Sequence, residues 1–235
     1  MLLSLILGAD PRELIIHLLL SIPIVLIALS THEAAHGYIA YKMGDRTAFN
    51  LGRVTLNPAK HLDLVGTILM ILFGYGWAKP VPINPRNFKN PKKGMALTAL
   101  AGPCINLILG IIGTFAYSLT LNLAFRFPPE SQFALNVISI LIQFFFLWAI
   151  YNYLYAVFNL IPVPPFDGSR FATLFLPTKW YFGIMKYERY ILIAILVGNI
   201  VLSRAFGINV FSGLAEKLFS LTVMPFHALF DLILF

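Results

Sequence analysis

The sequence predicts an all-α polytopic membrane protein with about four to six transmembrane helices. Of its 235 residues, 59% are hydrophobic and only 11% are charged, whereas soluble chains average roughly 45–50% apolar and about 25% charged residues. The mean hydropathy of +0.81 agrees with this shortage of charge. Such a composition excludes a disordered protein, a solvated α/β enzyme and a coiled coil.

Long apolar stretches, separated by short polar segments, predict the individual helices. A helix needs about 20 residues to cross the ~30 Å hydrocarbon core of a bilayer. Four stretches reach that length, at 13–41, 94–125, 133–160 and 181–202, and the second is expected to bend at Gly102-Pro103. The final stretch, 210–235, contains ionisable residues and predicts an interfacial helix, a last span, or both.

The apolar segment 64–77 is too short to cross a bilayer as an upright helix. Basic loops flank it on both sides, and the positive-inside rule prefers both loops on the cytoplasmic side. We therefore predict a re-entrant segment, with a tilted full span as the alternative. Residues 47–56 partly alternate between apolar and polar, which predicts small membrane-associated strands.

The charge balance and the cysteine count narrow the possible partners. Seventeen Lys and Arg residues against ten Asp and Glu residues give a net charge of +7. In a membrane protein this excess indicates cytoplasmic loops, and no arginine-rich face with interleaved aromatics indicates a nucleic-acid partner. The single cysteine, Cys104, excludes an intramolecular disulfide and a cysteine-based zinc cluster.

Residues 32–36 carry the pattern H-E-x-x-H inside the first apolar stretch. On a helix, His32 and His36 lie one turn apart on the same face, so their imidazoles can bind one zinc ion. Glu33 lies close enough to act as the general base on a water molecule at that ion. Ionisable side chains inside a membrane are costly unless they are paired or bind a metal. We therefore predict a metal centre here rather than a partly wetted helix end.

Two histidines need a third protein ligand, because catalytic zinc usually takes three. His17 lies about four turns before His32, roughly 22 Å along the helix axis, and is too far away. The remaining candidates are His61, Asp63, Asp167, His227 and Asp231. Asp167 is favoured, with Asp63 second, because three prolines unwind the chain just before Asp167. Irregular backbone at membrane depth is tolerated only where it lines a cavity or a site.

Asn159 ends the third apolar stretch, eight residues before Asp167. Its amide is able to donate a hydrogen bond to a developing oxyanion. On residue type alone, however, a helix C-cap or an interhelical hydrogen bond is the better interpretation.

Four ordered motifs resemble those of the site-2 protease family of intramembrane zinc metalloproteases, and in particular its compact prokaryotic group without a PDZ or CBS domain. The motifs are HEAAHG at 32–37, LNPAKHLD at 56–63 followed by GT at 66–67, GWAKPVPIN at 76–84 with AGP at 101–103 and Asn106, and NLIPVPPFDG at 159–168. The last fits the family signature N-x-x-P-x-P-x-x-D-G. H-E-x-x-H alone occurs in many zincins, whereas the ordered set, which covers residues 20–175, is specific.

This resemblance implies a zinc metalloendopeptidase with one Zn²⁺ ion per chain. His32, His36 and Asp167 would be the zinc ligands, Glu33 the catalytic base, and Asn159 the group that steadies the substrate or the oxyanion, which reverses the interpretation from residue type. The resemblance also implies an edge strand on which an unwound substrate segment pairs, and extended peptides do bind by strand addition. Its residues are Trp77, Ala78, Lys79, Pro80, Val81, Pro82, Ile83 and Asn84.

The same resemblance implies a substrate class, and the distribution of charge implies a location. One integral membrane metalloprotease domain is expected over 1–235, with additional membrane helices at 180–235 and no room for a PDZ or CBS domain. The expected activity is hydrolysis of peptide bonds within or near transmembrane segments of membrane-protein substrates, as in regulated intramembrane proteolysis. The expected partners are such a segment and the lipid bilayer. The protein is expected in the cell membrane as a multi-pass protein, with its active site near the cytoplasmic side, because His36 lies only ~9 Å inside the basic end of its helix.

Other functions use the same metal site. A metal transporter or a metal-dependent membrane chaperone would need the ligands but not Glu33, and the chain lacks the several intramembrane carboxylates expected of an ion pathway. A membrane metalloprotease of another class is disfavoured by the 159–168 motif, and a catalytically inactive relative is disfavoured by the intact Glu33. His and carboxylate ligands also suit iron or cobalt, so the ligands alone do not fix the ion.

Overall fold

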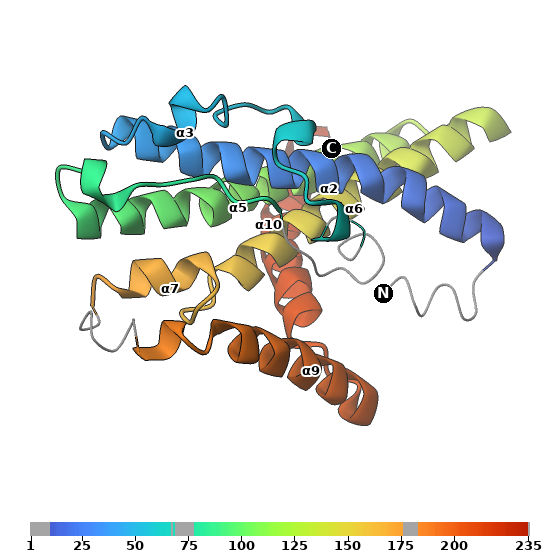
Figure 1. Ribbon diagram of the computed structural model, residues 1–235. Coiled ribbons are helices and arrows are strands. Elements are labelled where there is room, and N and C mark those ends of the chain that lie inside the picture. The colour runs from blue at the N-terminus through green and yellow to red at the C-terminus, as the bar shows by residue number, and fades with distance from the viewer. Residues whose placement is uncertain (1–9, 67, 69–77, 176–182, 235) are drawn as a thin grey trace.

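The computed structural model describes residues 10–66, 68, 78–175 and 183–234. The described part is a bundle of long helices joined by short helical turns and irregular segments (Figure 1). The helices are α2 (Pro11–Lys42), α3 (Thr47–Asn50), η1 (Pro58–Lys60), η2 (Pro85–Asn87), α5 (Pro91–Arg126), α6 (Gln132–Asn159), α7 (Asp167–Ala172), α9 (Glu188–Phe206) and α10 (Val210–Leu234).

Four of the described helices, α2, α5, α6 and α9, are long and apolar enough to cross a membrane. The prediction of an all-α polytopic membrane protein is therefore confirmed. The first three begin slightly before the apolar stretches, because the side chains of Asp10, Asn90 and Ser131 each accept a hydrogen bond from a backbone N–H in the first turn. The fourth begins at Glu188 rather than at residue 181, after a turn at 186–187. The final stretch forms one continuous helix, α10.

Helix α5 lies at the centre of the bundle and packs against α2, α6, α7 and α10. Close approach to α6 depends on two small residues, because a β-carbon on Gly110 would lie 2.5 Å from the Tyr153 ring and one on Gly113 would lie 2.5 Å from Trp148. Helices α2 and α5 lie side by side in Figure 1, and they bring residues 32–36 of α2 against residues 98–106 of α5. This packing forms the wall of the site described below.

The predicted small strands are wrong for the described residues. Residues 47–50 form α3, and Gly52 with φ +64° turns the chain out of that helix. The partial alternation was misleading because Asp45 accepts a hydrogen bond from the N–H of Thr47 and so favours a helical turn there. The described segment 78–84 forms no strand ladder either, because Pro80 and Pro82 lack donors. The N–H groups of Val81 and Asn84 pair with side chains, and the N–H of Lys79 donates to the carbonyl oxygen of His61.

The predicted re-entrant segment lies mostly outside the described residues. Residues 64–66 and 68 are helical, while residues 67 and 69–77, including Trp77 of the expected substrate edge, are not described. Both the re-entrant arrangement and the tilted span therefore remain predictions.

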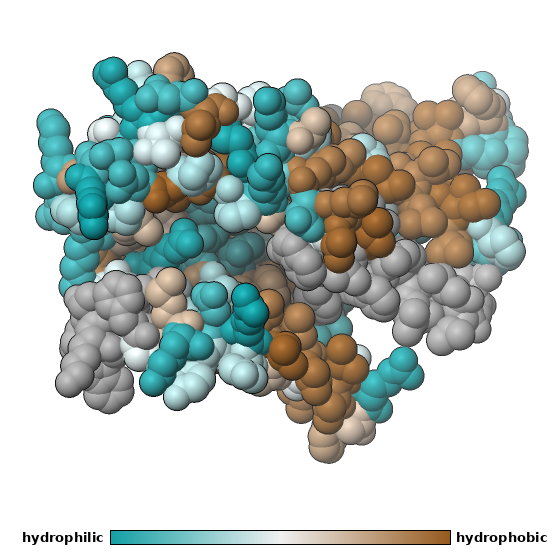
Figure 2. All heavy atoms as spheres, viewed as in Figure 1, coloured by the Kyte–Doolittle hydropathy of each residue, from teal (hydrophilic) through white to brown (hydrophobic). Residues whose placement is uncertain are grey.

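The surface separates into a hydrophilic end and an apolar body (Figure 2). Hydrophilic side chains gather where α2 ends and α5 begins, while hydrophobic side chains cover the rest of α2, α6 and α9. Basic residues of this hydrophilic end include Lys42, the last residue of α2, and Lys92 and Lys93 in the first turn of α5. The end that carries these residues is also the end nearest to His36.

Candidate metal centre and active site

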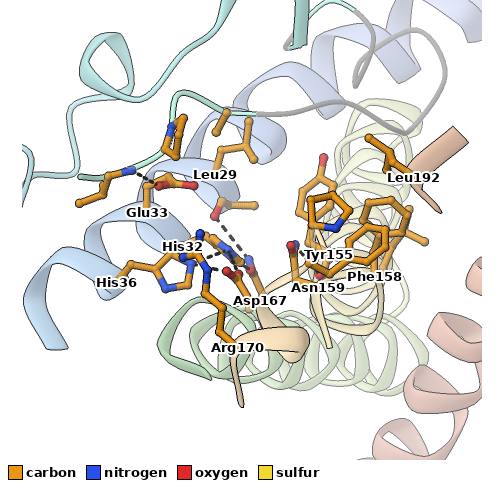
Figure 3. Close-up of a pocket in the computed structure, with 18 of the residues that line it drawn as sticks. Leu29, His32, Glu33, His36, Tyr155, Phe158, Asn159, Asp167, Arg170 and Leu192 are labelled. Atoms are coloured by element: carbon orange, nitrogen blue, oxygen red, sulfur yellow. Dashed lines mark hydrogen bonds and ion pairs between the residues drawn. The ribbon is translucent and has the colours of Figure 1, made fainter. Parts of the chain in front are cut away.

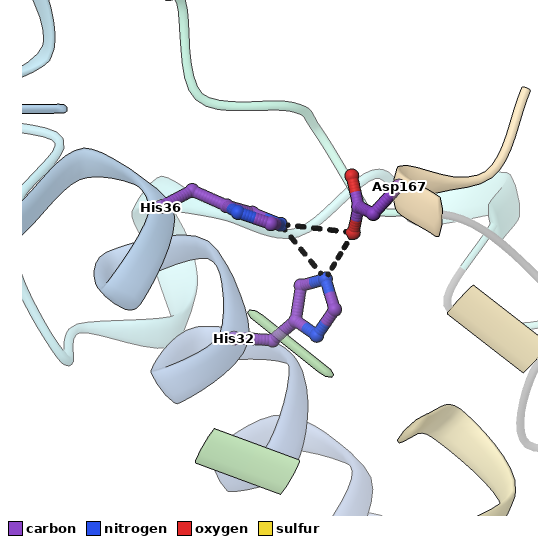
Figure 4. A group of neighbouring side chains, drawn as sticks. All are labelled: His32, His36 and Asp167. Atoms are coloured by element: carbon purple, nitrogen blue, oxygen red, sulfur yellow. Dashed lines mark hydrogen bonds and ion pairs between the residues drawn. The ribbon is translucent and has the colours of Figure 1, made fainter. Parts of the chain in front are cut away.

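The two histidines of the H-E-x-x-H pattern lie one turn apart on the buried face of α2 (Figure 4). Both side chains are almost inaccessible, with His32 and His36 each 6% exposed. Helix α5 covers them at Gly102, where a β-carbon would lie only 2.4 Å from Nε2 of His32 and 2.6 Å from Nε2 of His36. A glycine is therefore required at this point of α5.

Each imidazole is held through its Nδ1 atom. Nδ1 of His36 donates a hydrogen bond to the carbonyl oxygen of Thr98 at 2.7 Å, and Nδ1 of His32 donates to Oδ1 of Asn106 at 2.6 Å. An oxygen of this kind only accepts, so Nδ1 carries the hydrogen in both rings. In a neutral imidazole this leaves a lone pair on Nε2, which is the atom that a metal needs.

The two Nε2 atoms and one carboxylate oxygen converge on a single point (Figure 4). Oδ2 of Asp167 lies 3.1 Å from Nε2 of His32 and 3.1 Å from Nε2 of His36. The two Nε2 atoms lie 3.0 Å apart. In the described part of the chain, these are the three His, Cys, Asp or Glu residues whose ligand atoms group closely enough to hold a metal ion.

This donor set fits a zinc ion. Lone pairs on two nitrogens and a carboxylate oxygen face one another, an arrangement that a cation stabilises. Ligand atoms about 2.0–2.1 Å from a tetrahedral zinc lie about 3.3 Å from one another, close to the observed separations. Three protein ligands leave one coordination position for water or substrate, which is the pattern of catalytic rather than structural zinc.

Asp167 reaches the histidines because the chain leaves the helical path after α6. The segment 161–166 is irregular, and α7 begins at Asp167 itself. The next residue must be small, because a β-carbon on Gly168 would lie 2.3 Å from the carbonyl oxygen of Leu160. The proline-rich segment and this glycine together place the carboxylate at the level of His32 and His36.

Glu33 lies beside the metal-ligand group and is only 9% exposed (Figure 3). Its Oε2 atom accepts a hydrogen bond of 2.9 Å from the backbone N–H of Val81. Among the described residues, Oε1 of Glu33 has no hydrogen-bond partner. One oxygen therefore fixes the side chain while the other is free to accept a proton.

A cavity of about 670 Å³ connects these groups with the apolar interior of the bundle (Figure 3). His32, Glu33, His36 and Asp167 line one side, and residues of α6 and α9 line another. The α9 wall follows one face of that helix: it is apolar at Leu192, Leu196 and Ile200 and carries one charged residue, Glu188, at the start of the helix. Such a cavity accommodates an apolar polypeptide segment better than a polar one.

Asn159 also lines this cavity, but its amide already has a partner. Nδ2 of Asn159 donates to the carbonyl oxygen of Tyr155 at 3.0 Å within α6. This contact lies within the last turn of α6 and is neither a C-cap, which is Leu160, nor an interhelical hydrogen bond, the two roles expected from residue type. The second N–H and Oδ1 of Asn159 have no further hydrogen bond in the described structure, so they remain available to a ligand.

The segment 78–84 runs along the cavity and is held on its other side. Arg53 donates to the carbonyl oxygens of Lys79 and Pro80, at 2.7 and 3.2 Å. Asp45 accepts from the N–H of Asn84 at 2.7 Å. These side-chain contacts hold the segment extended without a strand partner.

Asp45, which holds the end of this segment through the N–H of Asn84, is fully buried. Burial acts to raise the pKa of its carboxyl group, but hydrogen bonds from Thr47, Asn84 and Asn87 favour the ionised form and outweigh it. The pKa of Asp45 is therefore below its usual value.

The other candidate ligands lie elsewhere. His61 is fully buried and its Nε2 donates to the carbonyl oxygen of Thr55 at 2.8 Å, while Asp63 accepts from the N–H of residue 66. His227 and Asp231 line a separate cavity between α5 and α10. The structure therefore brings Asp167, and none of these four, to the two histidines.

Three contacts at the site were not predicted from the sequence. They are the Nδ1 bonds of the histidines to Thr98 and Asn106, and the bond from Val81 to Glu33. Asn106 was marked as part of a motif but without a role. The other two involve backbone groups, which no residue pattern reveals.

The bundle and the converging ligand atoms define a multi-pass membrane protein with a zinc-type metal centre. The family model of peptidase family M50 matches residues 20–205. The protein named "Putative zinc metalloprotease YwhC" of Bacillus subtilis is 42% identical over 173 residues, which are 74% of this chain and 76% of that protein. "Putative zinc metalloprotease Rip2" of Mycolicibacterium smegmatis is 29% identical over 148 residues, which are 61% of this chain and 52% of that protein. No solved structure matches the chain.

The chain belongs to peptidase family M50, the site-2 protease family. It is accordingly a zinc metalloprotease, as the resemblance of its four motifs implied, and zinc is its cofactor.

Proposed function

We propose that this metalloprotease hydrolyses peptide bonds within or near the transmembrane segments of membrane-protein substrates, as a step in regulated intramembrane proteolysis. The observation that carries the proposal is the position of the ligand group and Glu33 in a cavity between helices that are apolar enough to span a membrane. Leu192, Leu196 and Ile200 of α9 line the cavity with apolar side chains, which match the chemistry of a transmembrane substrate.

We propose that His32, His36 and Asp167 are the zinc ligands and that Glu33 is the general base. Bound zinc supplies a Lewis acid that polarises the scissile carbonyl and makes water more acidic. Glu33 removes a proton from the attacking water through its free Oε1 atom and delivers it to the leaving amide nitrogen. The hydrogen bond from Val81 keeps the Glu33 carboxylate aimed at the cavity during both transfers.

The substrate binds as an extended segment, because the peptide bonds of an intact helix are shielded by their own hydrogen bonds. Ala78, Pro80, Val81 and Ile83 line the cavity and offer an extended backbone beside it. The N–H of Ile83 has no hydrogen-bond partner among the described residues and is suited to pair with a substrate carbonyl. Asn159, across the cavity, offers its remaining N–H to the substrate or to a developing oxyanion.

We propose a location in the cell membrane with the site near the cytoplasmic side. His36 lies six residues before Lys42, the last residue of α2, and thus ~9 Å inside the helix end. The basic residues gathered at this end favour the cytoplasmic side by the positive-inside rule. The polar end also offers water a short route to the metal centre.

The position of the cleaved bond tests this proposal. The protein is reconstituted in proteoliposomes with several unrelated single-span substrates, and the products are mapped by mass spectrometry, with a chelator-treated sample as the control. We expect zinc-dependent cleavage within the span or at its border. Cleavage restricted to distant aqueous tails would contradict the intramembrane assignment.

The same preparations test the alternative of a metal-transporting or inactive protein. Such a protein would retain zinc yet leave every substrate intact. Zinc flux into the same vesicles would then identify transport. We expect cleavage without zinc flux, because the described helices contribute one metal-ligand group rather than a path of carboxylates across the bundle.

A further inference from the structure

Asn152 is a polar residue in the middle of the apolar helix α6, and its exposed fraction is 0%. One of its two hydrogen bonds stays within α6, and the other leads toward the metal centre. Nδ2 donates to the carbonyl oxygen of Trp148 at 2.9 Å, and Oδ1 accepts from Nδ2 of Asn106 at 3.0 Å. A buried amide inside a membrane span is costly to desolvate, and its hydrogen bonds have to offset that cost.

The direction of this chain of hydrogen bonds is fixed at its far end. The carbonyl oxygen of Trp148 only accepts, so the nitrogen of Asn152 must face it and the oxygen of Asn152 must face Asn106. That oxygen accepts only from the nitrogen of Asn106, which also points at the carbonyl oxygen of Ala28, at 3.4 Å. The amide oxygen of Asn106 is therefore left facing His32, at 2.6 Å from Nδ1.

This orientation decides which nitrogen of His32 carries the hydrogen. An amide oxygen next to Nδ1 requires a hydrogen on Nδ1 and leaves the lone pair on Nε2, which faces Asp167 and His36. If the Asn106 amide were turned by 180°, its nitrogen would donate to Nδ1. The hydrogen of a neutral ring would then sit on Nε2, where it blocks a metal.

We propose that Asn152 is a positioning residue of the metal centre: acting through Asn106, it fixes the zinc-binding form of His32 without touching the metal, its ligands or the substrate. The proposal rests on the role of His32 as a zinc ligand. Second-layer partners of zinc-bound histidines change metal affinity by about 10–100-fold when they are removed. Asn152 contacts His32 only through Asn106, so we expect its removal to change zinc affinity by an amount near the lower end of that range.

The test measures zinc affinity, by competition with a chelator, in the full-length protein in detergent. We expect Asn152→Leu to weaken zinc binding about 10-fold, because only the long contact to the carbonyl oxygen of Ala28, at 3.4 Å, then opposes a turn of the Asn106 amide. The matched control is Tyr153→Phe. It removes the hydroxyl that contacts Thr114 at 3.0 Å and Thr222 at 2.9 Å, which is also a buried contact between helices, but one with no link to His32. The control should lose stability and keep its zinc affinity.

Two further variants separate positioning from a general loss of packing. Asn106→Asp presents an oxygen to His32 in either orientation, so in the Asn152→Leu background it should restore the zinc affinity. In an Asn106→Leu background, Asn152→Leu should cause no further loss, because Asn152 acts only through Asn106. Equal losses in Asn152→Leu and Tyr153→Phe, or full additivity of the two leucine variants, would overturn the proposal.

Failure of this inference is distinguishable from failure of the proposed function. Zinc affinity is read without any proteolysis, so an affinity loss in Asn152→Leu supports the inference even if no substrate is cut. If His32→Ala left zinc affinity unchanged, both the ligand assignment and this inference would be overturned.

Discussion

The close approach of α5 to the metal-ligand group gives a prediction whose size follows from the structure. In Gly102→Ala, the new β-carbon would lie 2.4 Å from Nε2 of His32 and 2.6 Å from Nε2 of His36. An unstrained contact of this kind is about 3.4 Å or more, so one ring or the helix has to move by roughly 1 Å. Zinc–ligand distances hold to about ±0.2 Å. A shift several times larger breaks the coordination geometry, and we expect zinc affinity to fall by at least about 100-fold.

The assay is the zinc dissociation constant of the purified protein, with thermal unfolding measured alongside. Gly198→Ala is the matched control, since it also adds a methyl group to a helical glycine but meets nothing within 4 Å. The control should keep its zinc affinity and gain up to about 1 kcal/mol of stability from helix propensity. Unchanged zinc binding in Gly102→Ala would mean that His32 and His36 do not bind the metal against α5, and would refute the reasoning.

Three further predictions concern the segment beside the cavity and the metal itself. The pKa of Asp45 is lowered in the folded protein, so its ionised carboxylate stabilises the fold. This contribution is fully present above the unfolded-state pKa of about 3.9 and is lost as pH falls through the folded-state pKa. Asp45→Asn should lower unfolding stability by roughly 1–3 kcal/mol at pH 7, and the difference from wild type should shrink below about pH 4 in a pH series of thermal melts; a constant difference would contradict the role of the charge. Val81→Pro removes the N–H that holds Glu33 and should lower kcat while bound zinc, measured by metal analysis, stays at one ion per chain; an unchanged kcat would show that this bond does not orient the base. Zinc removal by a chelator should lower the unfolding temperature, because zinc present at 100 times its Kd stabilises the folded state by about 2.7 kcal/mol; identical melts with and without zinc would contradict a centre that forms only in the folded protein.

The sequence predicts the membrane helices and the grouping of His32, His36 and Asp167, for identifiable reasons. Long apolar stretches set the helices, and the four-residue spacing of His32 and His36 places both rings on one face of α2. The prolines before Asp167 mark an irregular segment at membrane depth, and the structure does bring that carboxylate to the two histidines. Each of these features is local in the sequence.

The features that could not be predicted depend on tertiary packing. In place of the strands expected at 47–56, residues 47–50 form α3. The side chain of Asp45 accepts a hydrogen bond from the N–H of Thr47 and also pairs with residues 84 and 87 from a distant segment. The bond from Val81 to Glu33 joins a backbone group to a side chain 48 positions away. Nothing in the sequence distinguishes Asn152 from other residues of its helix, because its contact with Asn106 forms only when α5 packs against α6.

The most direct test of the account is cleavage of a single-span substrate by the wild-type protein and by Glu33→Gln, with zinc content determined in both. Gln retains an oxygen for the N–H of Val81, so its geometry is preserved while the proton acceptor is lost. Glu216→Gln, at an exposed site on α10, serves as the control and should cut at the wild-type rate. We predict one zinc ion per chain in all three proteins and loss of cleavage in Glu33→Gln alone. Undiminished cleavage by Glu33→Gln would contradict the central claim that Glu33 is the base at this zinc centre.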